Sequence, residues 1–193
     1  MTYPPEPWAL RGDLHLSVWF VRGGFDVPEG VSVVRVGPFA VVGTAWVDYR
    51  EGSVLTYREL MATVLVRKGL RLLPTITDIW VDSPESRDGG RALWGIPKDL
   101  AEFAVEGREW TAAGIARARV VPGARLPGRL PVGFSVAQTL AGALKVSRVR
   151  STARVRLGRV DWDVRADGPL GFLAGRSPAF SASMTGFDMR FGG

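Results

Sequence analysis

The chain has 193 residues, of which 46% are hydrophobic, and a formal net charge of +6 at pH 7. This length suits one globular domain with a substantial core, so we expect residues 1–193 to form a single domain. The sequence contains no cysteine, which excludes disulfide bonds, a thiolate nucleophile and a cysteine-ligated zinc site. The N-terminal segment lacks the features of a signal peptide and no apolar stretch is long enough to span a bilayer, so we expect a cytoplasmic protein without membrane contacts.

Most of the chain consists of short segments rich in Val, Leu, Trp and Phe, separated by Gly and Pro, which is a pattern typical of β-strands. The gaps are too short for helical crossovers, so the sheet should be mostly antiparallel. We expect strands near Leu14–Val21, Val31–Val36, Ala40–Val47, Leu60–Arg67, Thr75–Val81, Ala101–Glu106, Gly114–Val121, Ser147–Leu157 and Arg159–Arg165.

Two helices are also predicted. The tripeptide Ser83-Pro84-Glu85 supplies a cap, a proline for the first turn and an acid at the positive end of the dipole. It should start a short helix that Gly89-Gly90 weakens and that ends before Pro97. Ser135 could cap a second helix over Val136–Val146, because several apolar residues in that segment share one face.

The positive charge includes a basic run whose arginines alternate with apolar residues. This alternation is typical of a half-buried strand with a solvated face, and no aromatic stacking motif or recognition helix accompanies it. We therefore expect no nucleic-acid partner, and an anionic substrate would suit the same charge. The arginines of this run are Arg148, Arg150, Arg154 and Arg156.

Metal and nucleotide chemistry have little support in the sequence. His15 is the single histidine, so a histidine-based zinc site cannot be assembled, and its place in an alternating segment predicts a solvent-facing strand residue. No glycine-rich loop has the pattern of a phosphate-binding or dinucleotide-binding motif. We expect no metal and no organic cofactor.

The remaining chemistry is that of lysine, carboxylate and arginine. Lysine occurs only at positions 68, 98 and 145, and arginine supplies the rest of the 25 basic residues. Lys98 follows Trp94, Ile96 and Pro97, which can form an apolar wall that lowers the pKa of the amine. A neutral amine can form a Schiff base with a ketone, and arginine cannot replace it because arginine does not deprotonate in proteins.

The segment GRALWGIPKDL resembles the active-site stretch of the acetoacetate decarboxylase-like superfamily, in which the first of two adjacent lysines forms the Schiff base. The segment LTYRE, which ends at Glu59, is similar to the upstream Tyr-x-Glu of that family. The early ALRGDLHLSVWFV resembles its first strand, and the C-terminal part resembles the closing segment of short bacterial members. The resemblance therefore covers most of the chain.

The resemblance implies a role for several residues. Lys98 would be the imine-forming amine, Glu59 the carboxylate that moves or orients a proton, and Arg11 the cation that holds Glu59 or a substrate carboxylate. The substrate pocket would include the side chains of Trp80, Trp94 and Tyr57. Ordinary structural roles remain as alternatives: a solvated Lys98, a surface position for Glu59 or Arg11, and plain core packing for the two tryptophans.

Three positions depart from the family pattern. Asp99 stands in place of the second lysine, whose positive charge activates the first. A carboxylate beside the amine would raise its pKa, unless the strand is extended and Asp99 points away. Ala92 and Thr44 stand where the family has acidic residues, so part of the acid–base equipment is lost.

The resemblance implies an α+β, β-rich fold: a curled antiparallel sheet, cone-like or barrel-like, with a few short helices, assembled as a homo-oligomer. It implies a Schiff-base-forming lyase that acts on a small-molecule keto acid or carbonyl compound, by decarboxylation or by aldol and dehydration chemistry. The alternative is a repurposed pocket that binds or cyclises a biosynthetic intermediate without an imine.

Overall fold

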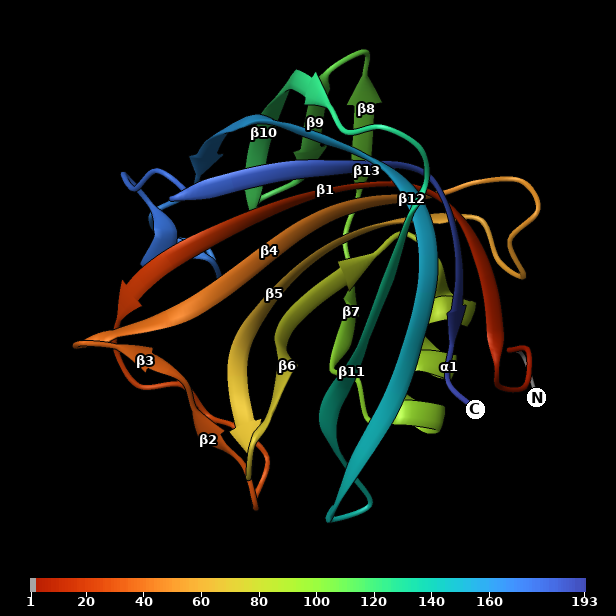
Figure 1. Ribbon diagram of the computed structural model, residues 1–193, viewed down its shortest axis with the longest axis vertical. Helices are drawn as coiled ribbons and strands as arrows, with labels where there is room; N and C mark the ends of the chain where they lie inside the picture. Colours follow the sequence, from red (N-terminus) through yellow and green to blue (C-terminus); the bar gives the residue numbers. More distant parts are fainter. Residues whose placement is uncertain (1–2) are drawn as a thin grey trace.

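The computed structural model describes residues 3–193 (Figure 1). Apart from one α-helix and one short 3-10 helix, the regular structure of these residues is β-sheet. The elements in chain order are β1 (Trp8–Arg22), β2 (Ser32–Val33), β3 (Arg35–Val36), β4 (Phe39–Tyr49), β5 (Tyr57–Lys68), β6 (Arg71–Val81), α1 (Pro84–Trp94), β7 (Lys98–Leu100), β8 (Phe103–Glu106), β9 (Glu109–Ala112), β10 (Ala116–Arg125), β11 (Leu130–Leu140), β12 (Ala143–Val164), the 3-10 helix Gly171–Leu173, and β13 (Phe180–Phe191).

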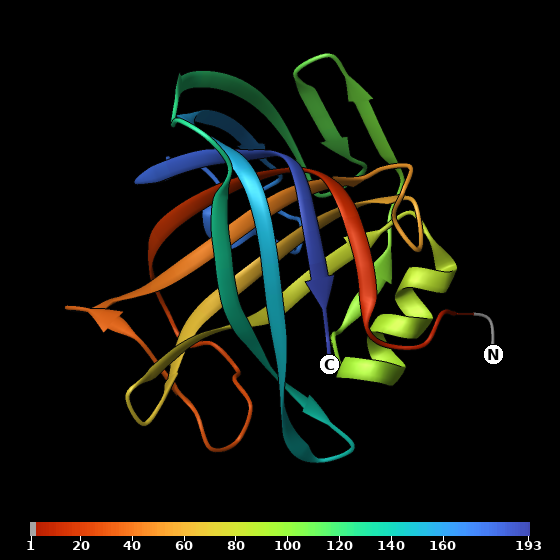
Figure 2. The same cartoon turned by 45° about the vertical axis from the view of Figure 1, so that its right-hand side comes forward.

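All strands belong to one sheet in the order β7-β6-β5-β4-β1-β13-β12-β10-β9-β8, with β11 paired to β12 and the short β2 and β3 paired to β5 and β4. The pairs are antiparallel, as predicted, except that β6 and β7 run parallel. This exception follows from α1, because a parallel connection needs a crossover and the helix supplies it. Figure 2 shows α1 at the side of the sheet, next to β7 and the beginning of β1.

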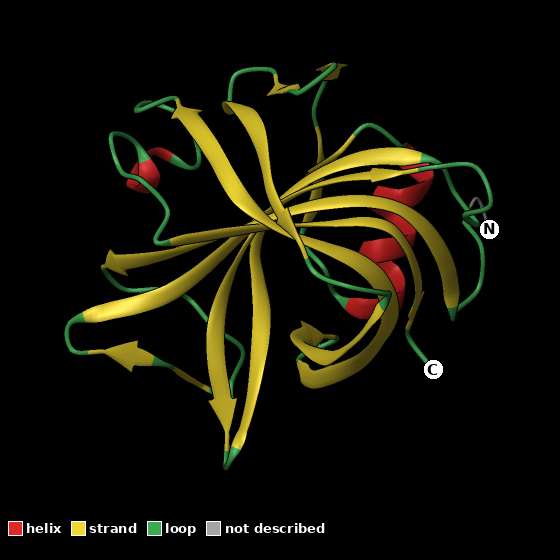
Figure 3. Ribbon diagram, turned by 45° about the horizontal axis from the view of Figure 1, so that its top comes forward, coloured by secondary structure: helices red, strands yellow, loops and turns green. Residues whose placement is uncertain are grey.

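The sheet is strongly curled but its ladder does not close into a barrel (Figure 3). Register shifts interrupt the pairing of β13 with β1 and β12, and of β6 with β5; the extra residues lie in β13 and β6, and such bulges let the long strands bend. At the open seam β11 meets β6 through a side chain: Gln138 accepts a hydrogen bond from Thr75 Oγ1 (3.1 Å) and donates one to the carbonyl of Ile76 (3.0 Å). The expected curled sheet is therefore confirmed, and its expected barrel-like form is not.

Apolar residues pack on both faces of the curled sheet. The inner cluster lies between the sheet and α1 and includes Trp8, Tyr49, Tyr57 and Trp94. The outer cluster forms where β8, β9 and β10 fold over β4 and β5, and its tryptophans are Trp46 and Trp110, with Trp80 and Trp162 packed against it. Thus the same strands separate a cavity-facing surface from a second core.

His15 is buried in this structure, so the prediction that it faces solvent is wrong. Its Nδ1 lies 2.8 Å from Ser183 Oγ, and its ring packs edge-on against Trp110. The reason is the covering layer formed by β8–β10, which buries an outer face that would otherwise be solvated. Burial lowers the pKa of His15 to about 4.

Several predicted elements are confirmed and others are wrong. The helix predicted after Ser83 is present, with Ser83 as its cap. The helix predicted over Val136–Val146 is instead a β-hairpin, because Ala141 and Gly142 adopt φ of 50° and 78° and form a tight turn that joins β11 to β12. Strands β7, β9 and β13 and the first part of β11 were not predicted, and one strand, β12, replaces the two expected between Ser147 and Arg165. In the described part of the chain, no helix is long and apolar enough to cross a membrane.

Candidate active site

The end of α1 determines where Lys98 lies. Gly95 ends the helix in the left-handed conformation (φ 68°), with its N–H bonded to the carbonyl of Arg91, and Ile96 N–H bonded to the carbonyl of Gly90. A side chain at position 95 would clash with the carbonyl oxygen of Thr139, at 2.0 Å from an added Cβ. Glycine is therefore required here on two grounds, and the chain turns directly from α1 into β7.

The short strand β7 separates Lys98 from Asp99. Lys98 is in register with Ile79 of β6 and Asp99 with Trp80, so each pair shares one face of the sheet. Ile79 and Lys98 face the inner side, where Lys98 is 3% exposed. Asp99 is exposed and forms an ion pair with Arg91. The carboxylate that replaces the second lysine of the family pattern thus points away from the amine.

Three side chains surround the amine of Lys98. Its Nζ lies 2.8 Å from Glu59 Oε2, 3.0 Å from Ser86 Oγ and 3.4 Å from Tyr57 OH. The other carboxylate oxygen of Glu59 accepts a hydrogen bond from Tyr49 OH (3.1 Å). All five residues are buried, so the ion pair is shielded from water.

The ammonium form of Lys98 is favoured in this environment. Burial by itself lowers the pKa of Lys98, but the charge of Glu59 and the hydrogen bonds that Nζ donates to Glu59 and Tyr57 outweigh it, and the pKa is raised above its usual value. The expectation that the apolar wall lowers this pKa is therefore wrong for the protein without ligand. Burial also raises the pKa of Tyr49 and of Tyr57, so both phenols stay protonated at neutral pH.

Two adjacent glycines of α1 make room for the site. An added Cβ at Gly90 would lie 2.7 Å from Lys98 Cδ, and one at Gly89 would lie 2.6 Å from the ring of Trp8. Glycine is unfavourable inside a helix, by about 1 kcal/mol relative to alanine. The two residues that weaken the helix are those that let the lysine and the tryptophan pack against it.

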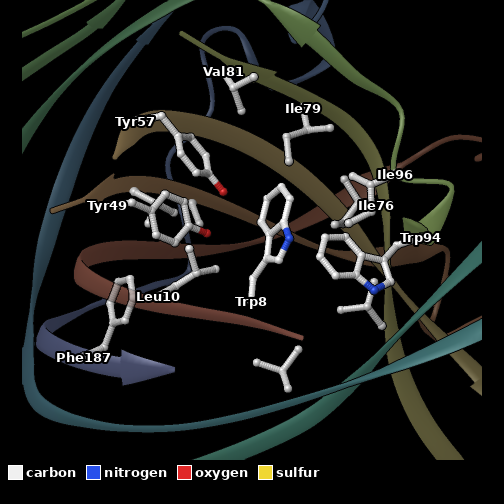
Figure 4. Close-up of a cluster of buried hydrophobic side chains, with 14 of the residues drawn as sticks. Trp8, Leu10, Tyr49, Tyr57, Ile76, Ile79, Val81, Trp94, Ile96 and Phe187 are labelled. Atoms are coloured by element: carbon white, nitrogen blue, oxygen red, sulfur yellow. The ribbon is translucent and has the colours of Figure 1, made fainter. Parts of the chain in front are cut away.

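A cavity of about 360 Å³ opens next to the amine, on the inner side of the sheet. Its inner end is lined by Lys98, Glu59 and a set of aromatic side chains. Figure 4 shows that the hydroxyl groups of Tyr49 and Tyr57 point toward Trp8, with Trp94 and Ile76 on the other side. Within residues 3–193, no group of three or more His, Asp or Glu side chains is placed to hold a metal ion.

The structure brings together four of the six residues singled out from the sequence: Lys98, Glu59, Tyr57 and Trp94 all line this cavity. Arg11 lies outside it. Because Leu10 points into the cavity, the next residue along β1 points outward, and Arg11 forms an exposed ion pair with Asp188 (3.1 Å).

Trp80 also lies outside the cavity. It follows Ile79 along β6 and therefore faces the opposite side of the sheet, where it packs against the outer cluster. Neither Arg11 nor Trp80 contacts the Lys98–Glu59 pair in this structure, so neither holds the position that the resemblance implies.

Sequence reasoning missed four residues of the site: Ser86, Tyr49, Trp8 and Gly90. For Gly90 a signal exists, since an unfavourable glycine pair in a capped helix indicates a close approach. Thr44, which stands where the family has an acid, lines the cavity and accepts a hydrogen bond from Trp19 Nε1 (2.9 Å).

The chain matches a known protein family in sequence. The chain matches the family model described as acetoacetate decarboxylase (ADC) over residues 27–148, a range that includes Glu59 and Lys98. No match to a curated protein was found.

Solved structures with a similar fold are distant in sequence. An acetoacetate decarboxylase from Legionella pneumophila is 16% identical with a TM-score of 0.71, and the alignment covers 100% of this chain and 87% of that one. The enduracididine biosynthesis enzyme MppR, complexed with pyruvate, is 15% identical with a TM-score of 0.66, covering 98% and 90%. An acetoacetate decarboxylase-like enzyme from Sphingomonas wittichii RW1 is 14% identical with a TM-score of 0.62, covering 100% and 92%. With a family match over more than half of its length, the chain belongs to the acetoacetate decarboxylase family.

Proposed function

We propose that this protein is a Schiff-base-forming lyase that acts on a keto acid or a related carbonyl compound, with Lys98 as the imine-forming amine. The observation that carries the proposal is the contact between Lys98 Nζ and Glu59 Oε2, 2.8 Å, at the buried end of an apolar cavity. A buried ammonium cannot attack a carbonyl until it loses a proton, and Glu59 is placed to accept it.

Lys98 and Glu59 together can supply and accept every proton that is needed to condense the amine with a carbonyl compound. Glu59 takes a proton from the Lys98 ammonium, and the neutral amine then attacks the carbonyl carbon, forming a C–N bond while the C=O electron pair moves to oxygen. The oxygen leaves as water with one proton from the nitrogen and one from Glu59. This leaves an iminium on Lys98 beside the carboxylate of Glu59, two opposite charges in place of the original two.

The iminium is an electron sink for the next step. It can accept the pair left by departing CO2, or the pair of an α C–H bond whose proton moves to a base. Tyr57 and Ser86 lie within hydrogen-bonding reach of the nitrogen and could orient it during both steps. Membership of the acetoacetate decarboxylase family, and the pyruvate complex of MppR, support a carbonyl compound as the ligand.

Borohydride trapping tests the proposal. Reduction in the presence of acetoacetate or pyruvate should add the ligand, as a secondary amine, to Lys98, and peptide mass spectrometry should locate it there. The variant Lys98→Ala should lose the adduct, whereas Lys145→Ala should keep it, because Lys145 contacts Glu6 outside the cavity. A folded wild-type protein that gives no adduct on Lys98 with a broad panel of carbonyl compounds would contradict the imine mechanism.

A second candidate function rests on the raised pKa of Lys98. At neutral pH the paired ammonium and carboxylate could bind or cyclise an intermediate by donating and accepting protons, without an imine. In that case borohydride would neither label Lys98 nor inactivate the protein, whereas Lys98→Met, which removes the proton donor, would impair binding or cyclisation. Assembly as a homo-oligomer remains a prediction from the resemblance, and a cytoplasmic location remains a prediction from the sequence.

A further inference from the structure

Beyond the polar groups at its inner end, the cavity beside Lys98 is lined mostly by apolar side chains up to its mouth. Its polar side chains are the Lys98–Glu59 pair, two tyrosines and two threonines, and the other side chains that line it are apolar. Exposure rises along it, from 2% at Glu59 to 43% at Phe134. The apolar residues toward the mouth are Leu14, Leu16, Met61, Val132, Phe134 and Met184.

The charges within the cavity already cancel. Lys98 and Glu59 form one ion pair, and no arginine is among the residues that line the cavity in the described part of the chain. The arginines next to site residues in the sequence are engaged elsewhere: Arg50 with Asp13 and Asp48, Arg58 with Asp82, Arg87 with Asp88, and Arg91 with Asp99 and the carbonyl of Lys98. A carboxylate on the substrate would therefore add a negative charge without a counterion.

Such a charge is costly in this setting. A carboxylate moved from water into an apolar site without a partner pays a large desolvation cost. Condensation does not remove the problem, because the iminium formed on Lys98 only replaces the ammonium that already balanced Glu59. A neutral carbonyl compound keeps the site neutral at every stage.

The size of the cavity indicates more than a small keto acid. A volume of 360 Å³ corresponds to about 12 water molecules at about 30 Å³ each. It falls within the range of pockets that bind drug-sized ligands, which is roughly 300–1,000 Å³. A hydrocarbon chain or ring attached to the carbonyl group would fill the apolar part between the amine and Phe134.

Resting on the proposed function, we infer that the substrate is an apolar ketone or aldehyde that carries no carboxylate, with its carbonyl carbon at Lys98 and its hydrocarbon part toward Met61, Met184 and Phe134. Such a compound has no CO2 to lose. The iminium instead loses an α-proton to Glu59: the C–H pair becomes the C=C bond of an enamine, and the C=N electron pair becomes a lone pair on nitrogen. This chemistry makes or breaks bonds at the α-carbon.

Four carbonyl compounds separate charge from size: 2-octanone, 7-oxooctanoate, acetone and acetoacetate. The first two have the same methyl ketone and chain length and differ by the terminal carboxylate. We expect borohydride trapping on Lys98 to be at least about tenfold more efficient with 2-octanone than with either 7-oxooctanoate or acetone, because of the missing counterion and the unfilled cavity respectively. Wild-type protein, but not Lys98→Ala, should also exchange the α-hydrogens of 2-octanone with deuterium from D2O.

A charge variant supplies the matched control. Met184→Arg places a cation in the apolar part of the cavity, and should raise trapping of 7-oxooctanoate relative to 2-octanone. Leu70→Arg adds the same charge at a fully exposed position outside the cavity, and should leave the ratio unchanged.

The outcomes distinguish the inference from the proposed function. Preferred trapping of 2-octanone supports both. Equal or better trapping of 7-oxooctanoate or acetoacetate overturns the neutral-substrate inference and leaves the Schiff-base function intact. No adduct with any of the four, or with other ketones and aldehydes, overturns the Schiff-base function itself.

Discussion

Gly90 of α1 lies directly against the side chain of Lys98. A methyl group at position 90 would come within 2.7 Å of Lys98 Cδ and 2.9 Å of Cε, closer than carbon atoms pack without moving. The helix and the lysine are thus fitted to each other along the alkyl chain, and the hydrogen bonds at Nζ depend on that fit.

Gly90→Ala should lower borohydride trapping on Lys98 by more than about tenfold, because the amine is displaced from Glu59 and Ser86. The usual gain of about 1 kcal/mol for alanine over glycine in a helix should not be seen in urea unfolding, since the clash opposes it. Ala92→Gly is the control: this exposed position of the same helix should lose about 1 kcal/mol in stability while trapping stays normal. Normal trapping by Gly90→Ala would show that the lysine is not held as described.

Glu59→Gln should shift the pH dependence of trapping to lower pH. In the wild type the raised pKa of Lys98 keeps the amine protonated, so the rate should increase with pH up to the alkaline range. Without the charge of Glu59, burial dominates and the pKa falls, although the maximal rate also falls because the proton acceptor is lost. Asp99→Asn should leave the profile unchanged, because Asp99 points away from the amine and pairs with Arg91. Identical pH profiles for the wild type and Glu59→Gln would show that the charge of Glu59 does not raise the pKa of Lys98.

Two serines at the start of α1 should have separable effects. Ser83 Oγ accepts the N–H of Ser86 (3.1 Å), so Ser83→Ala should cost about 1 kcal/mol of stability and leave trapping unchanged. Ser86 Oγ lies 3.0 Å from Lys98 Nζ, so Ser86→Ala should change the rate and pH dependence of trapping. Urea unfolding and the trapping assay, measured on both variants, separate the two roles. An unaltered pH profile of trapping in Ser86→Ala would refute a role of Ser86 at the amine of Lys98.

His15 should make the protein sensitive to mild acid. Its pKa of about 4 lies below the usual histidine value of 6.5, so between these pH values the unfolded chain binds a proton while the folded chain does not. Stability should therefore fall as the pH decreases from 6.5 to about 4, by up to about 3 kcal/mol. Because the chain has one histidine, NMR titration of its imidazole measures the pKa directly. His15→Gln should lose this part of the pH dependence, and a normal imidazole pKa would disprove the prediction.

Arg11→Ala should have little effect on the stability of the protein or on borohydride trapping at Lys98. The Arg11 side chain is 59% exposed and its ion pair with Asp188 is at the surface, where such pairs contribute about 0–1 kcal/mol. Trapping on Lys98 should match the wild type. A large loss of trapping would place Arg11 at the site after all, as the family resemblance implies.

The local signals in the sequence predicted the local structure around Lys98. The cap and proline at Ser83-Pro84 gave the correct start of α1, and the extended segment that follows Pro97 makes Asp99 point away from Lys98. These features depend on neighbouring residues alone, which explains why they can be read without the fold. The place of Glu59 beside the lysine was implied by the family resemblance, since no pattern within the chain links positions so far apart.

The sequence could not predict which side chains of a strand face the cavity, because this depends on pairing between strands that are distant in the sequence. Alternation along β6 shows that Ile79 and Trp80 face opposite sides, but only the parallel register with β7 decides which of them shares a face with Lys98. The same applies to Arg11, whose direction depends on which face of β1 lines the cavity. The apolar residues of segment 136–146 have the spacing of a helix face, but they belong to two strands. The tight turn at Ala141 and Gly142, which separates these strands, was not recognised in the sequence.

The open seam of the sheet lies beside the segment that positions the amine of Lys98. β6 carries β7 along one part of its edge and meets Gln138 of β11 along the other, while Gly95 is pressed against the carbonyl of Thr139. β7, the strand that bears Lys98, is paired with β6 on one side of this seam, and Gly95, which leads into β7, lies against β11 on the other. The position of Lys98 therefore depends on contacts with both of the strands that border the seam.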